Sequence, residues 1–369
     1  MRHDFLAFTP DDVDLSRSPL RGSLRADTYV LGAFNPGFTR LPNGNLLMMV
    51  RVAEALHGAM EGDFARAIRW AGRDGYVSDA HPKSGVDSSD PRKFMLTPHH
   101  AKTMALTSLS WLLPVEMDAE GQRTIAVHYE HAIAPQTTSE EYGIEDARIS
   151  RIDGRYYMTT CSVSAERHAT TLYTSDDGLR YRREGIVLDH QNKDMLLFEG
   201  RIGGKFWAMT RPLGDLYFAY PPDSDYLPGP AIHLASSPDA LHWKPWDAPF
   251  IRPRKHTRAN MRMGGGAPPI LTPQGWLILY HAVETRGLVG IYRTYWALAD
   301  AEEPSRITRL EDSRPLLEAD AALTAPHEAQ MYLRDVVFTT GIADAGDRYI
   351  VASGEADLAC RVTHIPKRR

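Results

Sequence analysis

The stretch Asp153-Gly154-Arg155-Tyr156-Tyr157 is a tight turn followed directly by an aromatic strand, and versions of it recur along the chain. Glycine beside Asp or Asn supplies the positive φ of a short hairpin turn, and the aromatic and aliphatic residues after it favour a pleated strand. The other versions are Asn43-Gly44-Asn45-Leu46-Leu47, Gly203-Gly204-Lys205-Phe206-Trp207, Gln274-Gly275-Trp276-Leu277 and Gly346-Asp347-Arg348-Tyr349-Ile350. Five such hairpins predict an all-β chain built from five repeats.

A second internal repeat supports this interpretation. The segments Ser175-Asp176-Asp177-Gly178-Leu179-Arg180-Tyr181 and Ser237-Pro238-Asp239-Ala240-Leu241-His242-Trp243 both end a strand in a Ser-x-Asp turn followed by an aromatic residue. The Ser and Asp side chains in such turns accept hydrogen bonds from nearby backbone N–H groups. Turns of this kind recur in β-propellers, so we predict a single five-bladed β-propeller over residues 1–369.

The chain departs from the repeat pattern between the first two hairpins. Arg51 to Trp70 is the one stretch with a trace of amphipathic helical periodicity. Residues 75–97 are polar, and we interpret them as an insertion over one face of the propeller, where insertions often shape a substrate pocket. A disordered surface loop explains the same residues equally well.

Charge and cysteine content exclude several classes of function. The 369 residues include 42 Lys and Arg against 47 Asp and Glu, a net charge of −5, which argues against nucleic acid or an anionic membrane as the main partner. Cys161 and Cys360 have no metal-type spacing, so neither a disulfide framework nor a zinc site is indicated. No signal-like or membrane-spanning apolar run is found. We therefore expect a cytoplasmic protein that needs no metal or cofactor.

Two acidic clusters are candidates for catalysis. Glu145-Asp146-Ala147-Arg148 places two acids beside a guanidinium, which can hold a carboxylate rigidly and tune its pKa. In the run from Asn192 to Arg201, Glu199 follows an apolar strand core and is a candidate for a partly buried acid. Ordinary ion pairs, such as Glu199 with Arg201, explain both clusters equally well or better.

Other polar residues stand at strand ends where apolar residues are expected. The innermost strands of a propeller converge on a central channel, where side chains from different repeats can meet, although they can also simply line a wet channel. These residues are Asn35, Arg51, Arg211, Arg262, His281, Glu284, Asp335, Glu355 and Asp357. The glycine run of Met263-Gly264-Gly265-Gly266-Ala267-Pro268-Pro269 lacks the features of a phosphate loop, and we interpret it as a tight connection at the pocket.

Several segments occur together in a fixed order. They are Phe34-Asn35-Pro36, Glu145-Asp146-Ala147-Arg148, Asn192-Lys193-Asp194, Thr210-Arg211-Pro212, Gly264-Gly265-Gly266-Ala267-Pro268-Pro269, Tyr280-His281, Val337-Phe338-Thr339-Thr340-Gly341 and Gly354-Glu355-Ala356-Asp357. This set resembles family 130 of the glycoside hydrolases, the mannoside phosphorylases and β-mannosidases. The resemblance covers most of the chain and implies a five-bladed propeller enzyme that cleaves β-mannosides with inversion at the anomeric carbon.

The resemblance also implies roles for individual residues. Asp146 corresponds to the catalytic acid of a Glu-Asp-Pro-Arg motif, whose Pro is Ala147 here. Asn35, Arg51 and Asp335 correspond to residues that hold the mannosyl unit. The positions near the incoming nucleophile are Arg148, Arg211, Arg262 and His281. Further substrate-binding residues are expected at Glu145, Lys193, Asp194 and Glu355.

The choice of nucleophile depends on departures from the family pattern. An arginine usual in the phosphorylases is replaced by Ala169, with Arg167 two residues away, and the usual His-Arg-Pro has become Thr210-Arg211-Pro212. A phosphate dianion needs several Arg, Lys or His partners, so both changes favour water. Hydrolytic members use a glutamate base in a Phe-Pro-Glu-Lys-Ile-like segment, which makes Glu199 in Phe198-Glu199-Gly200-Arg201-Ile202 the candidate base.

We therefore predict an inverting, β-1,2-mannosidase-like enzyme acting on manno-oligosaccharides. Inversion by hydrolysis requires two carboxyl groups roughly 6.5 to 9.5 Å apart, one as acid and one as base. The alternative is a mannoside phosphorylase that uses inorganic phosphate as co-substrate and releases mannose 1-phosphate. A non-catalytic glycan-binding propeller is the third, more distant interpretation. The expected partner is a small oligosaccharide, and the sequence leaves a homo-oligomer open.

Overall fold

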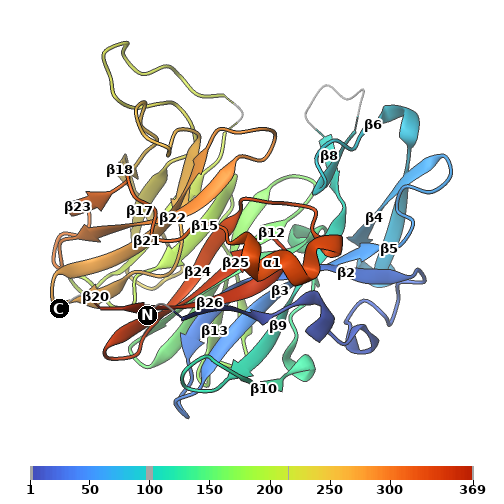
Figure 1. Ribbon diagram of the computed structural model, residues 1–369, viewed down its shortest axis with the longest axis horizontal. Helices are drawn as coiled ribbons and strands as arrows, with labels where there is room; N and C mark the ends of the chain where they lie inside the picture. The colour runs from blue at the N-terminus through green and yellow to red at the C-terminus, as the bar shows by residue number, and fades with distance from the viewer. Residues whose placement is uncertain (1–2, 97–102, 215, 368–369) are drawn as a thin grey trace.

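Five four-stranded antiparallel units make up most of the chain in the computed structural model, which describes residues 3–96, 103–214 and 216–367 (Figure 1). Unit 1 consists of β2 (Thr28–Arg40), β3 (Leu46–Leu56), β9 (Ser108–Met117) and β10 (Thr124–Val127). Unit 2 consists of β11 (Gly143–Ile152), β12 (Arg155–Val163), β13 (His168–Ser175) and β14 (Arg182–Leu188). Unit 3 consists of β15 (Asn192–Leu197), β16 (Phe206–Pro212), β17 (Ile232–Ser237) and β18 (Lys244–Ile251).

The last two units complete the set. Unit 4 consists of β19 (Arg262–Gly265), β21 (Gly275–Glu284), β22 (Ile291–Ala299) and β23 (Ile307–Glu311), with β20 (Ile270–Thr272) also paired to β21. Unit 5 combines β24 (Val337–Asp344), β25 (Arg348–Glu355) and β26 (Ala359–Pro366) with the N-terminal strand β1 (His3–Phe8). Within the described residues the one α-helix is α1 (Ala321–Thr324). The fold is therefore mostly β, as predicted.

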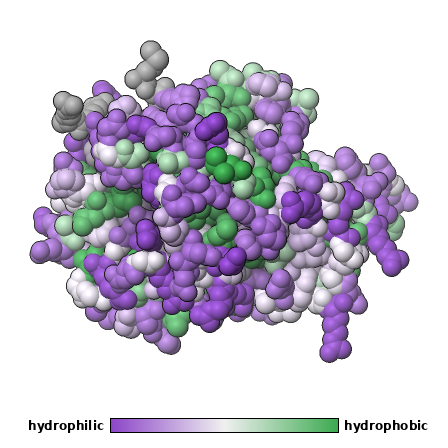
Figure 2. Space-filling view, turned by 90° about the horizontal axis from the view of Figure 1, so that it is seen from below, coloured by the Kyte–Doolittle hydropathy of each residue, from purple (hydrophilic) through white to green (hydrophobic). Residues whose placement is uncertain are grey.

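Short 3-10 segments lie in the connections. They are Pro10–Asp12, Leu15–Arg17, Gly72–Asp74, Lys83–Gly85, Tyr129–His131, Thr138–Glu140 and Ala325–Gln330. Within the described ranges, no helix is long and apolar enough to cross a membrane. On the face seen in Figure 2 hydrophilic residues predominate, and hydrophobic residues gather in small groups.

The predicted hairpin glycines occupy the same place in every unit. Each lies at the connection that leads into the second strand of its unit, with φ between +78° and +111°. The five are Gly44, Gly154, Gly204, Gly275 and Gly346. In the Ser-x-Asp turns before β14 and β18, Asp177 and Asp239 each accept two backbone N–H groups, as predicted. Local turn chemistry thus sets the repeat of the fold.

The hydrophobic core is divided into clusters that join successive units. One contains Leu47 and Tyr156 and joins units 1 and 2, and another contains Leu172 and Phe206 and joins units 2 and 3. Met209 and Tyr280 belong to the cluster between units 3 and 4. Leu279 and Val351 belong to the cluster between units 4 and 5. The contacts therefore follow the order of the units along the chain.

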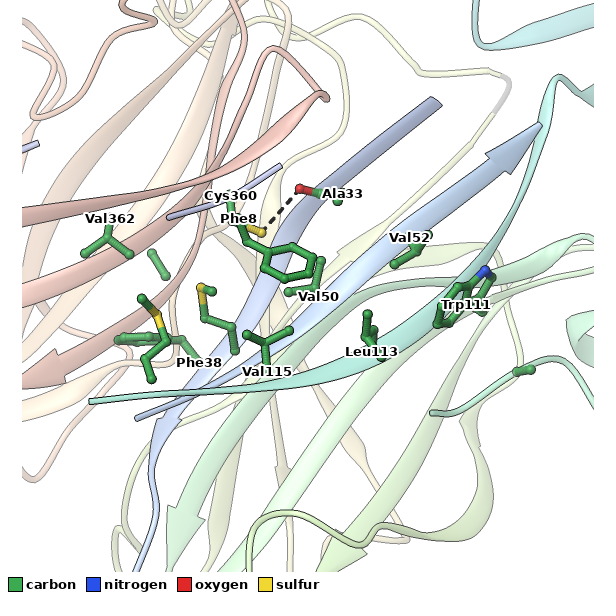
Figure 3. Packing of buried hydrophobic residues seen from close by; sticks show 14 of the residues in the cluster. Phe8, Ala33, Phe38, Val50, Val52, Trp111, Leu113, Val115, Cys360 and Val362 are labelled. Carbon is green, nitrogen blue, oxygen red and sulfur yellow. Dashed lines mark hydrogen bonds between the residues drawn. The ribbon is translucent and has the colours of Figure 1, made fainter. Parts of the chain in front are cut away.

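A further cluster brings the two ends of the chain together. Figure 3 shows Phe8 of β1 beside Val50 of unit 1, and Val362 of β26 and Trp111 of unit 1 belong to the same cluster. The thiol of Cys360 contacts the carbonyl oxygen of Ala33 in β2 at 3.4 Å. Each fully buried large side chain of this kind contributes about 1.5 to 3 kcal/mol. Unit 5 thus packs against unit 1, and the N-terminal strand holds this junction.

Two expectations for residues 51–97 need correction. Arg51 to Trp70 is not helical, because it contains the end of β3 and the strand β4 (Phe64–Trp70), whose buried and exposed residues largely alternate. The insertion is wider than 75–97 and forms small sheets rather than a loop. Its other strands are β5 (Tyr76–Pro82), β6 (Val86–Asp87), β7 (Lys93–Leu96) and β8 (Thr103–Leu106), and Thr97 lies outside the described residues.

Asp4→Ala should destabilise the fold, because Asp4 of β1 accepts bonds from the buried Arg361 of β26 at 2.6 and 2.7 Å. Removing one partner of a buried pair leaves the other charge undercompensated, and we expect a loss of about 3 kcal/mol in the free energy of unfolding. Urea denaturation measures it. Asp74→Ala, at an exposed position, is the control, and equal midpoints for the two variants would contradict this account of the junction.

Candidate active site

A cavity of about 590 Å³ collects side chains from all five units and from the insertion. Its polar lining consists of Asn35, Arg51, Arg92, Lys93, Thr107, Ser108, Glu145, Asp146, His168, Gln191, Lys193, Asp194, Arg211, Arg262, Tyr292, Tyr332 and Asp357. Most of the predicted site residues are therefore brought together, although they are far apart in the sequence. The volume is in the range of small-molecule sites.

One local device presents three of these side chains. Asn35, Asp146 and Asp194 lie in the first strands of units 1, 2 and 3, at points where the pairing register shifts. All three have a left-handed backbone, with φ of +47°, +51° and +54°. Asn and Asp tolerate this conformation better than other non-glycine residues. A register shift of this kind changes the direction in which the side chain points. The residue type is thus dictated partly by the backbone at the cavity.

Asp146 is held by two neighbours from unit 1. Its Oδ1 accepts hydrogen bonds from Asn35 Nδ2 and from Arg51 Nη1, both at 2.9 Å. Arg51 also donates to Glu145 Oε1 at 3.0 Å, and Lys193 donates to Glu145 Oε2 at 2.8 Å. Burial alone would raise the pKa of Asp146, but Arg51 and further cations outweigh it and hold that pKa below its ordinary value. Asp146 is therefore ionised in the unliganded protein.

A second charged group surrounds Asp194 on the side of units 3 and 4. Its carboxylate lies 2.9 Å from Arg211 Nε, 3.6 Å from Arg148 Nη2 and 3.5 Å from His281 Nε2. Burial and the nearby arginines lower the pKa of His281 well below its ordinary value, so its imidazole is neutral.

Arg262 completes this group from β19. It donates to the Tyr292 hydroxyl and to the Val289 carbonyl at 3.2 Å. Within the part of the chain that the structure describes, neither Arg262 Nε nor His281 Nδ1 has a hydrogen-bond partner, although both atoms are buried. Arg211 and Arg262 both line the cavity, so two guanidinium groups face a ligand on this side.

The first part of the glycine run is a strand, and its second part, from Gly266 to Pro269, is the connection expected from the sequence. Gly264 and Gly265 belong to β19, and a Cβ at Gly264 would lie 2.2 Å from Asp194 Oδ2. The carbonyl of Gly266 accepts a bond from Arg148 Nε at 2.7 Å. Glycine is required here because the backbone of unit 4 approaches the charged group directly.

Four predicted binding residues do not line the cavity. Arg148 and His281 are fully buried beneath it and contact ligand-facing residues instead. The side chain of Asp335 is exposed, and its carbonyl accepts the N–H of Tyr292. Glu355 is buried, but its carboxylate accepts hydrogen bonds from Arg361 Nη1 at 2.8 Å and from the backbone N–H of Asp320.

Glu199 lies at the wrong end of its strand for the predicted base. Glu199 lies beyond the end of β15, five residues after Asp194, which is a span of at most roughly 16 Å at about 3.3 Å per residue. The Glu199 carboxylate accepts the backbone N–H of Arg151, near the Gly154 hairpin, at 3.4 Å. Burial raises the pKa of Glu199 to about 7, yet the side chain does not line the cavity. The structure therefore contradicts its assignment as base.

Several lining residues were not among the predicted binding residues. Asp357 was named only among the strand-end polar residues; it lies in a left-handed turn (φ +49°), and burial raises its pKa to about 6. Its strand-end position was visible in the sequence, but nothing there favoured it over Glu355. Arg92 and Lys93 come from the insertion, and their polarity was the one available signal. His168 lines the cavity beside the buried Ala169.

The cavity has a charge opposite to that of the chain. Among the described residues, six Arg and Lys side chains but only four carboxylates line the cavity, whereas the whole chain has a net charge of −5. The described residues contain no group of three or more His, Cys, Asp or Glu side chains placed to hold a metal ion. The arrangement can bind an uncharged, hydroxyl-rich ligand together with a small anion.

Comparison with known proteins agrees with this chemistry. Residues 110–369 match a family model described as beta-1,4-mannooligosaccharide phosphorylase. The chain is 30% identical to a beta-1,2-mannobiose phosphorylase of Listeria innocua over 340 residues, which cover 89% of this chain and 87% of that protein. It is 32% identical to a 1,2-beta-oligomannan phosphorylase of Thermoanaerobacter over 62% of this chain and 69% of that protein.

A solved structure gives the same result for the fold. The complex of a Listeria innocua beta-1,2-mannobiose phosphorylase with beta-1,2-mannobiose superposes with a TM-score of 0.80 and 26% identity, covering 99% of this chain and 97% of the other. The similarity thus includes every unit that lines the cavity. The chain is an enzyme of glycoside hydrolase family 130, which contains mannoside phosphorylases and related hydrolases.

Proposed function

We propose that this enzyme is a β-mannoside phosphorylase: it cleaves a β-mannosidic bond of a short manno-oligosaccharide with inorganic phosphate and releases α-mannose 1-phosphate. The observation that carries the proposal is the excess of cations in the cavity, six Arg and Lys side chains against four carboxylates, with Arg211 and Arg262 on the side of units 3 and 4. A phosphate dianion supplies acceptor oxygens for these guanidinium groups and balances the positive charge of the cavity. The names of the two relatives described above, both phosphorylases, point the same way.

The position of Glu199 also favours phosphate over water. Hydrolysis with inversion needs a carboxylate base on the face opposite the acid. Glu145 and Asp194 are each neutralised by two cations, and Glu199 lies outside the cavity. Asp357 interacts electrostatically with Asp146 and Arg51, so it lies on the side of the acid and not opposite to it. Phosphate is already an anion at neutral pH and requires no such base. The loss of an arginine at Ala169 is thereby outweighed by the cations that remain.

The residues of unit 1 and unit 2 would act on the sugar. Asn35 and Arg51 orient the mannosyl unit and the carboxylate of Asp146, and Asp146 transfers a proton toward the leaving oxygen, directly or through a sugar hydroxyl. The anomeric C–O bond breaks as a phosphate oxygen forms the new bond. Entry of the phosphate dianion raises the low pKa of Asp146, so that Asp146 takes up a proton before the bond breaks. Asp146 gives this proton to the leaving alcohol, and the proton that HPO₄²⁻ loses as it becomes the ester dianion replaces it, so protons balance over one turnover.

We also propose that the five units are the blades of one five-bladed β-propeller forming a single catalytic domain. Support comes from the five hydrophobic clusters, which join each unit to the next and unit 5 to unit 1. The first strands of units 1, 2 and 3 carry the Asn and Asp residues of the cavity, which is the arrangement expected of strands around a propeller axis.

Cleavage of β-1,2- and β-1,4-mannobiose should depend strictly on phosphate. With phosphate, proton NMR should show α-mannose 1-phosphate and one mannose per bond broken, since attack occurs opposite the leaving group. Without phosphate, turnover should nearly cease. Equal rates with and without phosphate, and two free mannose molecules per bond, would identify a hydrolase instead.

Asp146→Asn should lower kcat by about 10² to 10⁴ on β-mannobiose, because general acid assistance is lost. An aryl β-mannoside with an acidic leaving group should be much less affected, since its leaving oxygen needs little protonation. Glu199→Gln serves as the comparison and should keep nearly normal activity on both substrates. A large loss in Glu199→Gln would restore that residue to the mechanism.

Arg262→Met should raise the KM for phosphate by about 10-fold or more, because one charge-assisted contact to the anion is removed. The KM for β-mannobiose at saturating phosphate should change little. Initial-rate kinetics with both substrates varied separates the two effects. If the mannobiose KM rises alone, the anion is not bound at Arg262.

A further inference from the structure

The insertion after β3 contributes one rigidly held arginine to the cavity. Asp90 is 5% exposed, and its carboxylate binds Arg92 through Nε and Nη2, both at 2.9 Å. The backbone N–H of Arg92 donates to the same carboxylate at 3.0 Å. This fork-to-carboxylate geometry fixes the plane of the guanidinium. No partner of Arg92 Nη1 is found in the described ranges, so this end of the fork is available to a ligand.

The strand that directly follows Arg92, β7, is anchored by buried side chains. Phe94 of β7 is 4% exposed and packs with Ala65, Ala67 and Ala105 of neighbouring strands in the insertion. Lys93, between Arg92 and Phe94, also lines the cavity. The insertion therefore forms a fixed part of the cavity wall.

Arg92 lies toward the mouth of the cavity. Its side chain is 32% exposed, against 10% for Asp146 and 15% for Arg51. The residues assigned to the mannosyl unit thus occupy the deeper part. A sugar that leaves the enzyme must lie on the side nearer to solvent, which is where the insertion contributes.

The charge around Arg92 favours sugar hydroxyls over phosphate. Asp90 already neutralises it and also lies 3.8 Å from Lys93 Nζ. Asp357, which interacts electrostatically with Arg92, would repel a dianion there. The buried Nε of Arg262 and Nδ1 of His281, by contrast, have no acceptor among the described residues. A neutralised guanidinium with one free end is suited to donate to vicinal hydroxyl groups.

We propose that Arg92 is a specificity-determining residue that binds hydroxyl groups of the leaving sugar, and that Asp90 is its positioning residue. This inference rests on the proposed function. It gives the insertion a defined role in substrate recognition, because Arg92 would select the sugar at the end of the substrate that is released.

Synthesis from α-mannose 1-phosphate and mannose tests this, because the acceptor binds where the leaving sugar departs. Arg92→Met should raise the KM for mannose by about 10-fold or more, with the KM for mannose 1-phosphate little changed. Asp90→Asn should shift the same constant in the same direction by less. Arg73→Met, an exposed arginine of the same insertion, is the control and should change neither constant. Thermal midpoints verify that each variant is folded.

An unchanged KM for mannose in folded Arg92→Met, or an equal rise in both constants, would overturn the inference. If the wild-type enzyme does not use mannose 1-phosphate, the proposed function fails, and hydrolysis then tests Arg92 separately. In that case the KM for β-mannobiose should still rise in Arg92→Met. The KM for phenyl β-mannoside should stay constant, since its leaving group offers a guanidinium no hydroxyls. Equal KM changes for the two substrates would again reject the role of Arg92.

Discussion

The ion pairs of Arg51 connect the fold to the chemistry. Arg51 comes from the second strand of unit 1, whereas Glu145 and Asp146 come from the first strand of unit 2. Burying these charges is costly, and removing one partner leaves the others uncompensated, at about 3 to 5 kcal/mol. The packing of units 1 and 2 therefore has to be kept for the charges to be paired. In return, the acid is held in one orientation before any substrate binds.

The two sides of the cavity differ in charge. Around Asp146, Arg51 and Lys193 pair with the carboxylates of Glu145 and Asp146, and the cations there lower the pKa of Asp146. On the side of units 3 and 4, Arg211 and Arg262 line the cavity. A neutral sugar on the first side and an anion on the second would match these charges. This division explains how a chain of net negative charge accommodates a phosphate dianion.

Turn chemistry and ordered motifs made much of the fold and part of the site predictable. The hairpin glycines and Asp146 are readable because local geometry restricts the residue type at each. The assignment of Glu199 rests on a resemblance to a Phe-Pro-Glu-Lys-Ile-like segment, and that resemblance does not record that Glu199 lies beyond the end of β15 and outside the cavity. The choice of Glu355 over Asp357 failed for a related reason, since the partner Arg361 is visible only in three dimensions. Arg92 reaches the cavity only because of how the insertion folds, and no local sequence pattern predicts that.

A crystal structure of Asp146→Asn with phosphate and β-1,2-mannobiose tests the central claim most directly. The account predicts phosphate within hydrogen-bond reach of Arg211 and Arg262, on the opposite side of the anomeric carbon from the leaving oxygen, with residue 146 near that oxygen. Phosphate bound elsewhere, or an ordered water in line with the anomeric carbon and a carboxylate behind it, would contradict the account and identify the enzyme as a hydrolase.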